Sequence, residues 1–96
     1  EKTSAKMQML RAGDACIELW EYENPSPASQ DPNYSPANHG WAHIALQVTD
    51  IFQEYERLTE AGMTFHRPPV TNLGQGDSAA IYGRDPFGNI VELYEP

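Results

Sequence analysis

The sequence has a single cysteine, Cys16, among its 96 residues. One cysteine cannot form a disulfide within the chain, so a small secreted fold held by cross-links is excluded. The sequence also has no apolar run of the length of a signal peptide or a membrane span. These two absences predict a cytoplasmic protein that has no membrane as partner.

Basic residues are scarce as well. Six Lys and Arg stand against 14 Asp and Glu, which gives a formal net charge of −8 at pH 7. A chain of this charge repels phosphate backbones and anionic lipid headgroups. Nucleic acid is therefore excluded as an expected partner, and a small molecule is favoured.

One strand pattern occurs twice. Residues 17–22 read Ile-Glu-Leu-Trp-Glu-Tyr, and residues 91–95 read Val-Glu-Leu-Tyr-Glu. Such self-similarity indicates a duplicated module. Because side chains alternate between the faces of a strand, Glu18 and Glu92 each lie on a largely apolar face. Placing a carboxylate on such a face costs free energy unless a positive group pairs with it. A metal ion is the positive partner that would need both glutamates.

Residues 41–96 carry the pattern of a complete β-α-β-β-β module. Its expected elements are strands at 41–49, 64–70, 78–84 and 89–95, a helix that Asp50 caps and Gly62 ends, and a glycine-rich loop at 74–77. The first residues predict only a hairpin, with strands at 6–12 and 15–22, which corresponds to the last two strands of such a module. Four prolines within residues 24–40 disfavour both helix and sheet there.

The predicted fold class is therefore α+β, with one complete module and the last two strands of a preceding one. We expect an incomplete first module at 1–23, a proline-rich linker at 24–40 and a complete second module at 41–96. The apolar hairpin leaves an open edge and an apolar face, so a second copy of the chain is expected to pack there as a homodimer.

His43 lies on the first strand of the complete module and Glu92 on its last strand. These strands are neighbours if the sheet curls, which would bring the two side chains together. With Glu18 they form a nitrogen and oxygen donor set that suits Zn, Ni, Co, Mn or Fe(II) more than a closed structural zinc site. The sequence thus predicts Glu18, His43 and Glu92 as ligands of a divalent metal.

Two segments resemble the vicinal oxygen chelate superfamily, which includes glyoxalase I, extradiol dioxygenases and bleomycin-resistance proteins. They are residues 41–48, Trp-Ala-His-Ile-Ala-Leu-Gln-Val, and residues 82–95, Tyr-Gly-Arg-Asp-Pro-Phe-Gly-Asn-Ile-Val-Glu-Leu-Tyr-Glu. The arrangement of Glu18, His43 and Glu92 looks most like glyoxalase I, the lactoylglutathione lyase. Epimerases of the superfamily often have glutamine at the position of Glu18. Extradiol dioxygenases need a second histidine near residues 73–75, where this sequence has Leu, Gly and Gln.

The resemblance implies a metal-dependent lyase or isomerase that acts through a metal-chelated enediolate on a small substrate with neighbouring oxygens. Glutathione is implied as a possible co-substrate, in the form of a hemithioacetal, and Glu92 is implied as the catalytic base. Two alternatives remain. One is a protein of the bleomycin-resistance type that sequesters a drug without turnover, and the other is an inactive truncated member of the family.

Four further residues are candidates for substrate binding: Trp20, Trp41, Arg67 and Tyr94. Aromatic side chains on strands more often belong to a core. Arg67 is an anchor for an anionic substrate in one interpretation and a surface charge in the other.

Overall fold

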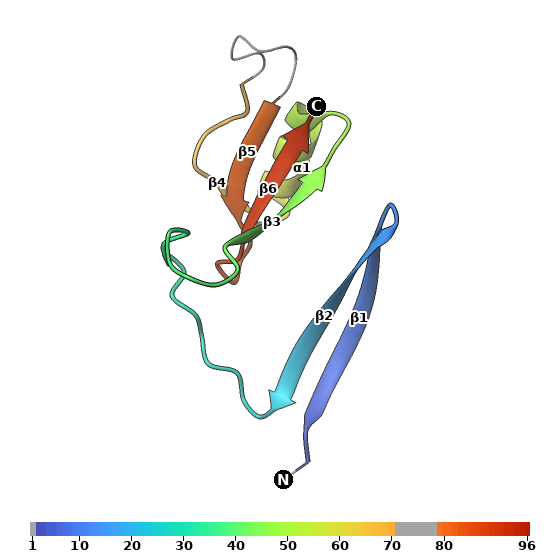
Figure 1. Cartoon of the computed structure of the whole chain (residues 1–96), viewed down its shortest axis with the longest axis vertical. Coiled ribbons are helices and arrows are strands. Elements are labelled where there is room, and N and C mark those ends of the chain that lie inside the picture. Colours follow the sequence, from blue (N-terminus) through green and yellow to red (C-terminus); the bar gives the residue numbers. More distant parts are fainter. Residues whose placement is uncertain (1, 71–78) are drawn as a thin grey trace.

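The computed structural model describes residues 2–70 and 79–96, which form two separate sheets (Figure 1). The first sheet is a hairpin of β1 (Ser4–Ala12) and β2 (Ala15–Asn24), which pair antiparallel. Gly13 lies in the tight turn between them with a φ of 60°, a backbone conformation that glycine adopts without a steric penalty. The hairpin expected at residues 6–22 is therefore present, with longer strands.

The second sheet contains β3 (His43–Gln47), β4 (Thr64–Phe65), β5 (Ala79–Arg84) and β6 (Ile90–Glu95), in the order β3-β6-β5-β4. β3 runs parallel to β6, whereas β5 is antiparallel to both β6 and β4. A single helix, α1 (Ile51–Glu60), connects β3 to β4 within the described residues. This βαβββ order confirms the predicted α+β fold, and it makes the first and last strands of the module direct neighbours.

Two of the predicted strands are shorter than expected. β4 ends at Phe65 instead of residue 70, because Pro68 and Pro69 have no backbone N–H to donate to a strand ladder. β3 begins only at His43, and Trp41 lies fully exposed ahead of it. The predicted glycine-rich loop at 74–77 lies outside the described residues.

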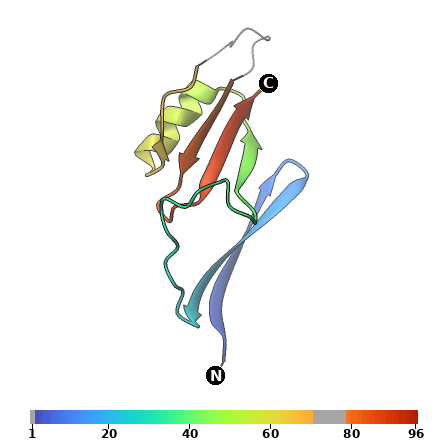
Figure 2. The same cartoon turned by 60° about the vertical axis from the view of Figure 1, so that its left-hand side comes forward.

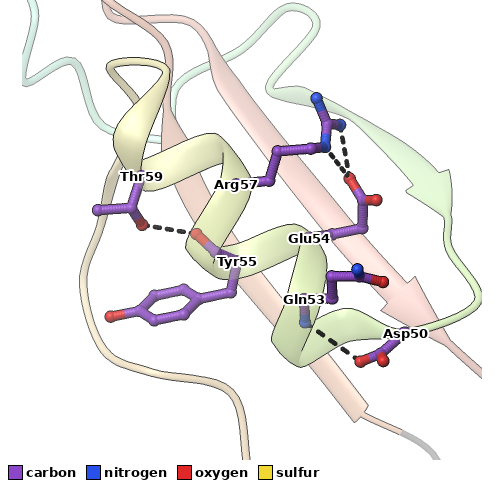
Figure 3. A network of polar contacts seen from close by, with 6 residues as sticks. All are labelled: Asp50, Gln53, Glu54, Tyr55, Arg57 and Thr59. Carbon is purple, nitrogen blue, oxygen red and sulfur yellow. Dashed lines mark hydrogen bonds and ion pairs between the residues drawn. The ribbon is translucent and has the colours of Figure 1, made fainter.

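Local hydrogen bonds fix both ends of α1, and Figure 3 shows the contact of the Asp50 side chain at the N-terminal end. The Asp50 carboxylate accepts a hydrogen bond from the backbone N–H of Gln53 at 3.1 Å, as the capping pattern predicts. At the other end Gly62 has a φ of 115°, and the Met63 N–H donates to the Leu58 carbonyl at 2.9 Å. This is the geometry of a Schellman motif, which satisfies carbonyls that the helix leaves unpaired.

The helix covers one face of the second sheet, as Figure 2 shows. The fully buried side chains of this layer are Ile51 of α1, Ile81 of β5 and Leu93 of β6, and Leu46, Tyr55 and Phe65 pack around them. The Glu95 carboxylate also accepts from the Ile51 N–H at 3.1 Å, so β6 satisfies a free donor at the helix N-terminus. The opposite face of the sheet, which carries His43 and Glu92, is not covered by α1.

Residues 25–42 cross from the hairpin to β3 without regular secondary structure, and they dock on the turn between β5 and β6. The Gln30 side-chain amide donates to the Phe87 carbonyl and to Asn89 Oδ1, at 3.0 and 2.8 Å. The Tyr34 hydroxyl donates to the Ala42 carbonyl at 3.0 Å and accepts from the Ile90 N–H at 3.3 Å. The segment thus closes one end of the open sheet face. No helix in the described part of the chain is long and apolar enough to cross a membrane.

Candidate functional site

His43 and Glu92 meet on the open face of the second sheet. In the parallel ladder His43 pairs with Ile90 and Ala45 pairs with Glu92, so the two side chains are diagonal neighbours on one face. His43 Nε2 lies 3.0 Å from Glu92 Oε1. The His43 side chain is 31% exposed and that of Glu92 is 17% exposed. The pair is therefore accessible to a ligand and partly shielded from water.

Tyr82 on β5 is the third member of this cluster. It pairs directly with Glu92 in the antiparallel ladder, and its ring meets the His43 ring edge to face with centroids 5.1 Å apart. A hydrogen bond with the Glu92 carboxylate, and secondarily the charge of that carboxylate, raise the pKa of Tyr82 above its ordinary value. Tyr82 and Glu92 are therefore electrostatically coupled across the β5–β6 ladder.

A cavity of about 580 Å³ adjoins the cluster. Its wall includes His43 and Tyr82 together with Phe65, His66, Arg84 and Ile90, and the docked segment contributes Asn33 and Pro36. Ligand sites commonly have volumes of roughly 300–1,000 Å³ and mostly apolar walls with a few polar groups. The cavity has the size and chemistry of a small-molecule site, and the His43–Glu92 pair lies at its side.

Glu18, the third predicted metal ligand, does not join this pair. It lies on β2 opposite Met9 of β1, in the separate hairpin sheet. Among residues 2–70 and 79–96, no three His, Cys, Asp or Glu side chains come together as a possible metal site. One described chain therefore unites two of the three predicted ligands, and the metal site itself stays a prediction.

None of the four predicted substrate-binding residues is among the described residues of the cavity wall. Trp20 lies on the hairpin, where its ring stacks with that of Tyr22. Trp41 is fully exposed, and Arg67 donates to the neighbouring Pro68 carbonyl at 3.3 Å. Tyr94 shares the open face with Glu92, one position further along β6 on that face. Their role in binding remains a prediction.

The cavity wall instead contains His66, Tyr82 and Arg84, which the sequence did not single out as site residues. Tyr82 and Arg84 alternate with Ile81 and Gly83 along β5, so the period of two places them on the face of Glu92 once the pairing of β5 with β6 is known. His66 follows the short β4. Its position depends on where that strand ends, which the sequence pattern did not indicate.

The sequence also matches a known protein family. A family model described as the Glyoxalase/Bleomycin resistance protein/Dioxygenase superfamily matches residues 1–93. No curated protein matches the sequence significantly.

Two solved structures share the fold. A glyoxalase family protein from Bacillus cereus superposes with a TM-score of 0.82 at 21% identity, over 97% of this chain and 62% of that one. A member of the glyoxalase/bleomycin resistance protein/dioxygenase superfamily from Sphaerobacter thermophilus gives a TM-score of 0.57 at 25% identity, over 95% of this chain and 67% of that one. The chain thus spans less than two thirds of the length of the Bacillus cereus protein.

Proposed function

The chain belongs to the Glyoxalase/Bleomycin resistance protein/Dioxygenase superfamily, and on this premise we propose that it is a metal-dependent lyase or isomerase of the glyoxalase type. The observation that carries the proposal is the contact of 3.0 Å between His43 and Glu92 on an open sheet face beside a cavity. A glutathione hemithioacetal is one candidate substrate, because it has neighbouring oxygens next to a C–H bond.

The donor chemistry of the pair suits a divalent metal. One imidazole nitrogen and one carboxylate oxygen from adjacent strands converge, and this set fits Zn, Ni, Co, Mn or Fe(II). When bound, such an ion supplies Lewis-acid polarisation of the substrate oxygens and so lowers the pKa of the adjacent C–H. Further ligands have to come from water, substrate or another protein group, because two side chains do not complete a coordination sphere.

Glu92 is the proposed general base. Its carboxylate takes the proton from the substrate carbon and returns it to the neighbouring carbon, so the proton is conserved in an isomerisation. Tyr82 lies directly opposite Glu92 in the β5–β6 ladder, and its proximity to this carboxylate raises the pKa of Tyr82. The ring of Tyr82 packs against that of His43, and the docked segment forms part of the cavity wall beside them.

Metal binding is the first test. We expect His43→Ala and Glu92→Ala each to weaken Ni or Zn binding by about tenfold or more, because each removes an atom that binds the metal directly. Elemental analysis after dialysis and a competition titration measure this loss. His39→Ala and Glu56→Ala are matched controls, since both residues are exposed and lie outside the cluster. Unchanged metal content in both ligand variants would refute the assignment.

A sequestering protein is the second candidate, and it is favoured by one observation: the described residues of one chain hold two, not three, grouped metal-ligating side chains. Turnover separates the two candidates. With methylglyoxal, glutathione and added Ni or Zn, we expect formation of a thioester that a chelator abolishes, because metal is essential only to the lyase. No turnover with any divalent metal, combined with tight binding of a hydrophobic ligand, would favour sequestration.

A further inference from the structure

The cavity beside the His43–Glu92 pair differs in charge from the rest of the molecule. The chain has a net charge of −8, yet the described residues of the cavity wall include Arg84 and two histidines and neither Asp nor Glu. The histidines are His43, which contacts Glu92 at 3.0 Å, and His66. In a strongly acidic protein, such a wall is a local site for negative charge.

Arg84 supplies a permanent positive charge that no described carboxylate neutralises. Its guanidinium donates to the Gly88 carbonyl at 3.1 Å and to the Tyr34 carbonyl at 2.9 Å, and it lies 4.8 Å from the centre of the Tyr34 ring. The ion pairs among residues 2–70 and 79–96 join His43 to Glu92 and Arg57 to Glu54. The backbone carbonyls fix the position of the guanidinium without cancelling its charge.

Asp85, which follows Arg84 in the sequence, uses its carboxylate for hydrogen bonds within the turn between β5 and β6. Asp85 Oδ1 accepts from the backbone N–H groups of Phe87 and Asn89, each at 2.9 Å, and Oδ2 accepts from the Asn89 side-chain amide at 2.9 Å. These bonds build the turn between β5 and β6. They hold the carboxylate within the turn, so Arg84 retains its capacity to attract an anion.

Among the described residues, one ring nitrogen of His66 has a hydrogen-bond partner in the backbone and the other has none. Its Nδ1 lies 2.9 Å from the Tyr82 carbonyl oxygen, and a carbonyl only accepts, so Nδ1 carries the proton. Nε2 then accepts from a ligand hydroxyl when the ring is neutral, and it donates to an anion when the ring is charged. The contact with Tyr82 also ties His66 to the strand that carries Arg84.

We propose that this cavity selects a small organic acid, with Arg84 and His66 recognising its carboxylate and Phe65 and Ile90 contacting its apolar part. The inference rests on the proposed function for the chemistry at Glu92, and it names the class of substrate. A carboxylate fits better than a neutral group, because the half-buried guanidinium of Arg84 has no carboxylate partner among the described residues. A volume of about 580 Å³ limits the acid to a compact molecule.

Mandelate is a suitable probe, since it combines a carboxylate, a neighbouring hydroxyl and an apolar ring, and mandelamide is its neutral analogue. In buffer with chelator, calorimetry should show mandelate binding about tenfold more tightly than mandelamide, as expected for a hydrogen-bonded charge. His66→Ala and Arg84→Met should each remove most of this preference. His39→Ala and Arg11→Met are matched controls, because neither residue lies on the cavity wall.

Arg84 also holds the docked segment, so Arg84→Met needs a check of its fold by circular dichroism. If that variant unfolds, His66→Ala still decides the question, because His66 is exposed and its hydrogen bond among the described residues is to the backbone of β5. Equal affinity for mandelate and mandelamide would overturn the proposal. The proposal would also be overturned if Arg67→Ala abolished the preference for mandelate and His66→Ala left it intact.

The chelator separates this proposal from the proposed function. In one outcome, the protein prefers mandelate without metal, and its Ni or Zn binding does not depend on His43 and Glu92. This result would refute the metal site and support the anion site. Metal binding that requires both residues, together with no preference for the acid, would support the metal site and refute the anion site.

Discussion

At the residue scale, Gly83 shows how one missing side chain shapes the cavity wall. A Cβ at this position would lie 2.7 Å from two ring carbons of Phe65 and 2.9 Å from the terminal methyl of Met63. Phe65 cannot easily move, because its ring packs against Tyr55, with centroids 5.1 Å apart, and against the buried cluster. Gly83 lies in a strand interior and its φ is not positive, so close packing and not backbone conformation requires glycine here.

We therefore expect Gly83→Ala to destabilise the fold. Alanine restricts the unfolded chain and so contributes roughly 0.4–1 kcal/mol of stability, but overpacking costs about 1–3 kcal/mol. The net loss should be on the order of 1–2 kcal/mol, measured by urea unfolding at a fixed protein concentration. In a double-mutant cycle, Phe65→Leu should offset part of the loss, because it removes the clashing ring. Stability equal to or above the wild type would contradict this account.

At the element scale, local patterns predicted the elements whose signals lie within a few residues. The alternation of residues 42–48, the Asp50 cap and the Asp85–Gly88 turn each depend on short-range chemistry, and β3, α1 and the β5–β6 turn follow them. His43 and Glu92 were placed correctly on one face for the same reason. The meeting of the two side chains could be expected, because the first and last strands pair within one module.

The docking of residues 25–42 on β5 and β6 had no local sequence signal of this kind. Tyr34 bridges Arg84 and Ile90 across 50 and 56 sequence positions, and nothing in the proline-rich composition of its segment indicates that contact. The basic cavity wall was missed for this reason, since Arg84 acquires its fixed position from Tyr34 and from the turn. His66 was missed because the end of β4 was predicted too late. The first error concerns a tertiary contact without a local signal, and the second concerns a strand end that Pro68 and Pro69 set locally.

At the scale of the whole molecule, the hairpin stands apart from the second sheet, and the molecule is elongated (Figure 1). Its radius of gyration is 15.6 Å, against about 13 Å for a compact domain of 100 residues. Its accessible surface is 7708 Å², whereas a compact monomer of this mass exposes roughly 5,500 Å². This excess is more than the roughly 800 Å² that each partner buries in a protein–protein interface of standard size.

Much of this excess is apolar surface of the hairpin, which has no covered face. Met7, Met9 and Trp20 lie on one side and Leu10 and Leu19 on the other, and each is at least 42% exposed. An isolated two-stranded hairpin is only marginally stable in water, so these side chains need another surface. A second copy of the chain offers one of matching character, in a two-fold arrangement.

We therefore expect the 96-residue chain to be a dimer at micromolar concentration in sedimentation velocity. Leu19→Asp should shift it toward monomer, because it places a charge on an apolar contact face.

We further expect Glu18 of a second copy to complete the metal site of His43 and Glu92, since the described residues of one chain do not bring the three side chains together. Glu18→Gln should then leave the dimer intact and weaken metal binding by about tenfold. A compact monomer that binds metal with unchanged affinity after Glu18→Gln would exclude this arrangement, because neither the apolar hairpin nor Glu18 would then depend on a partner.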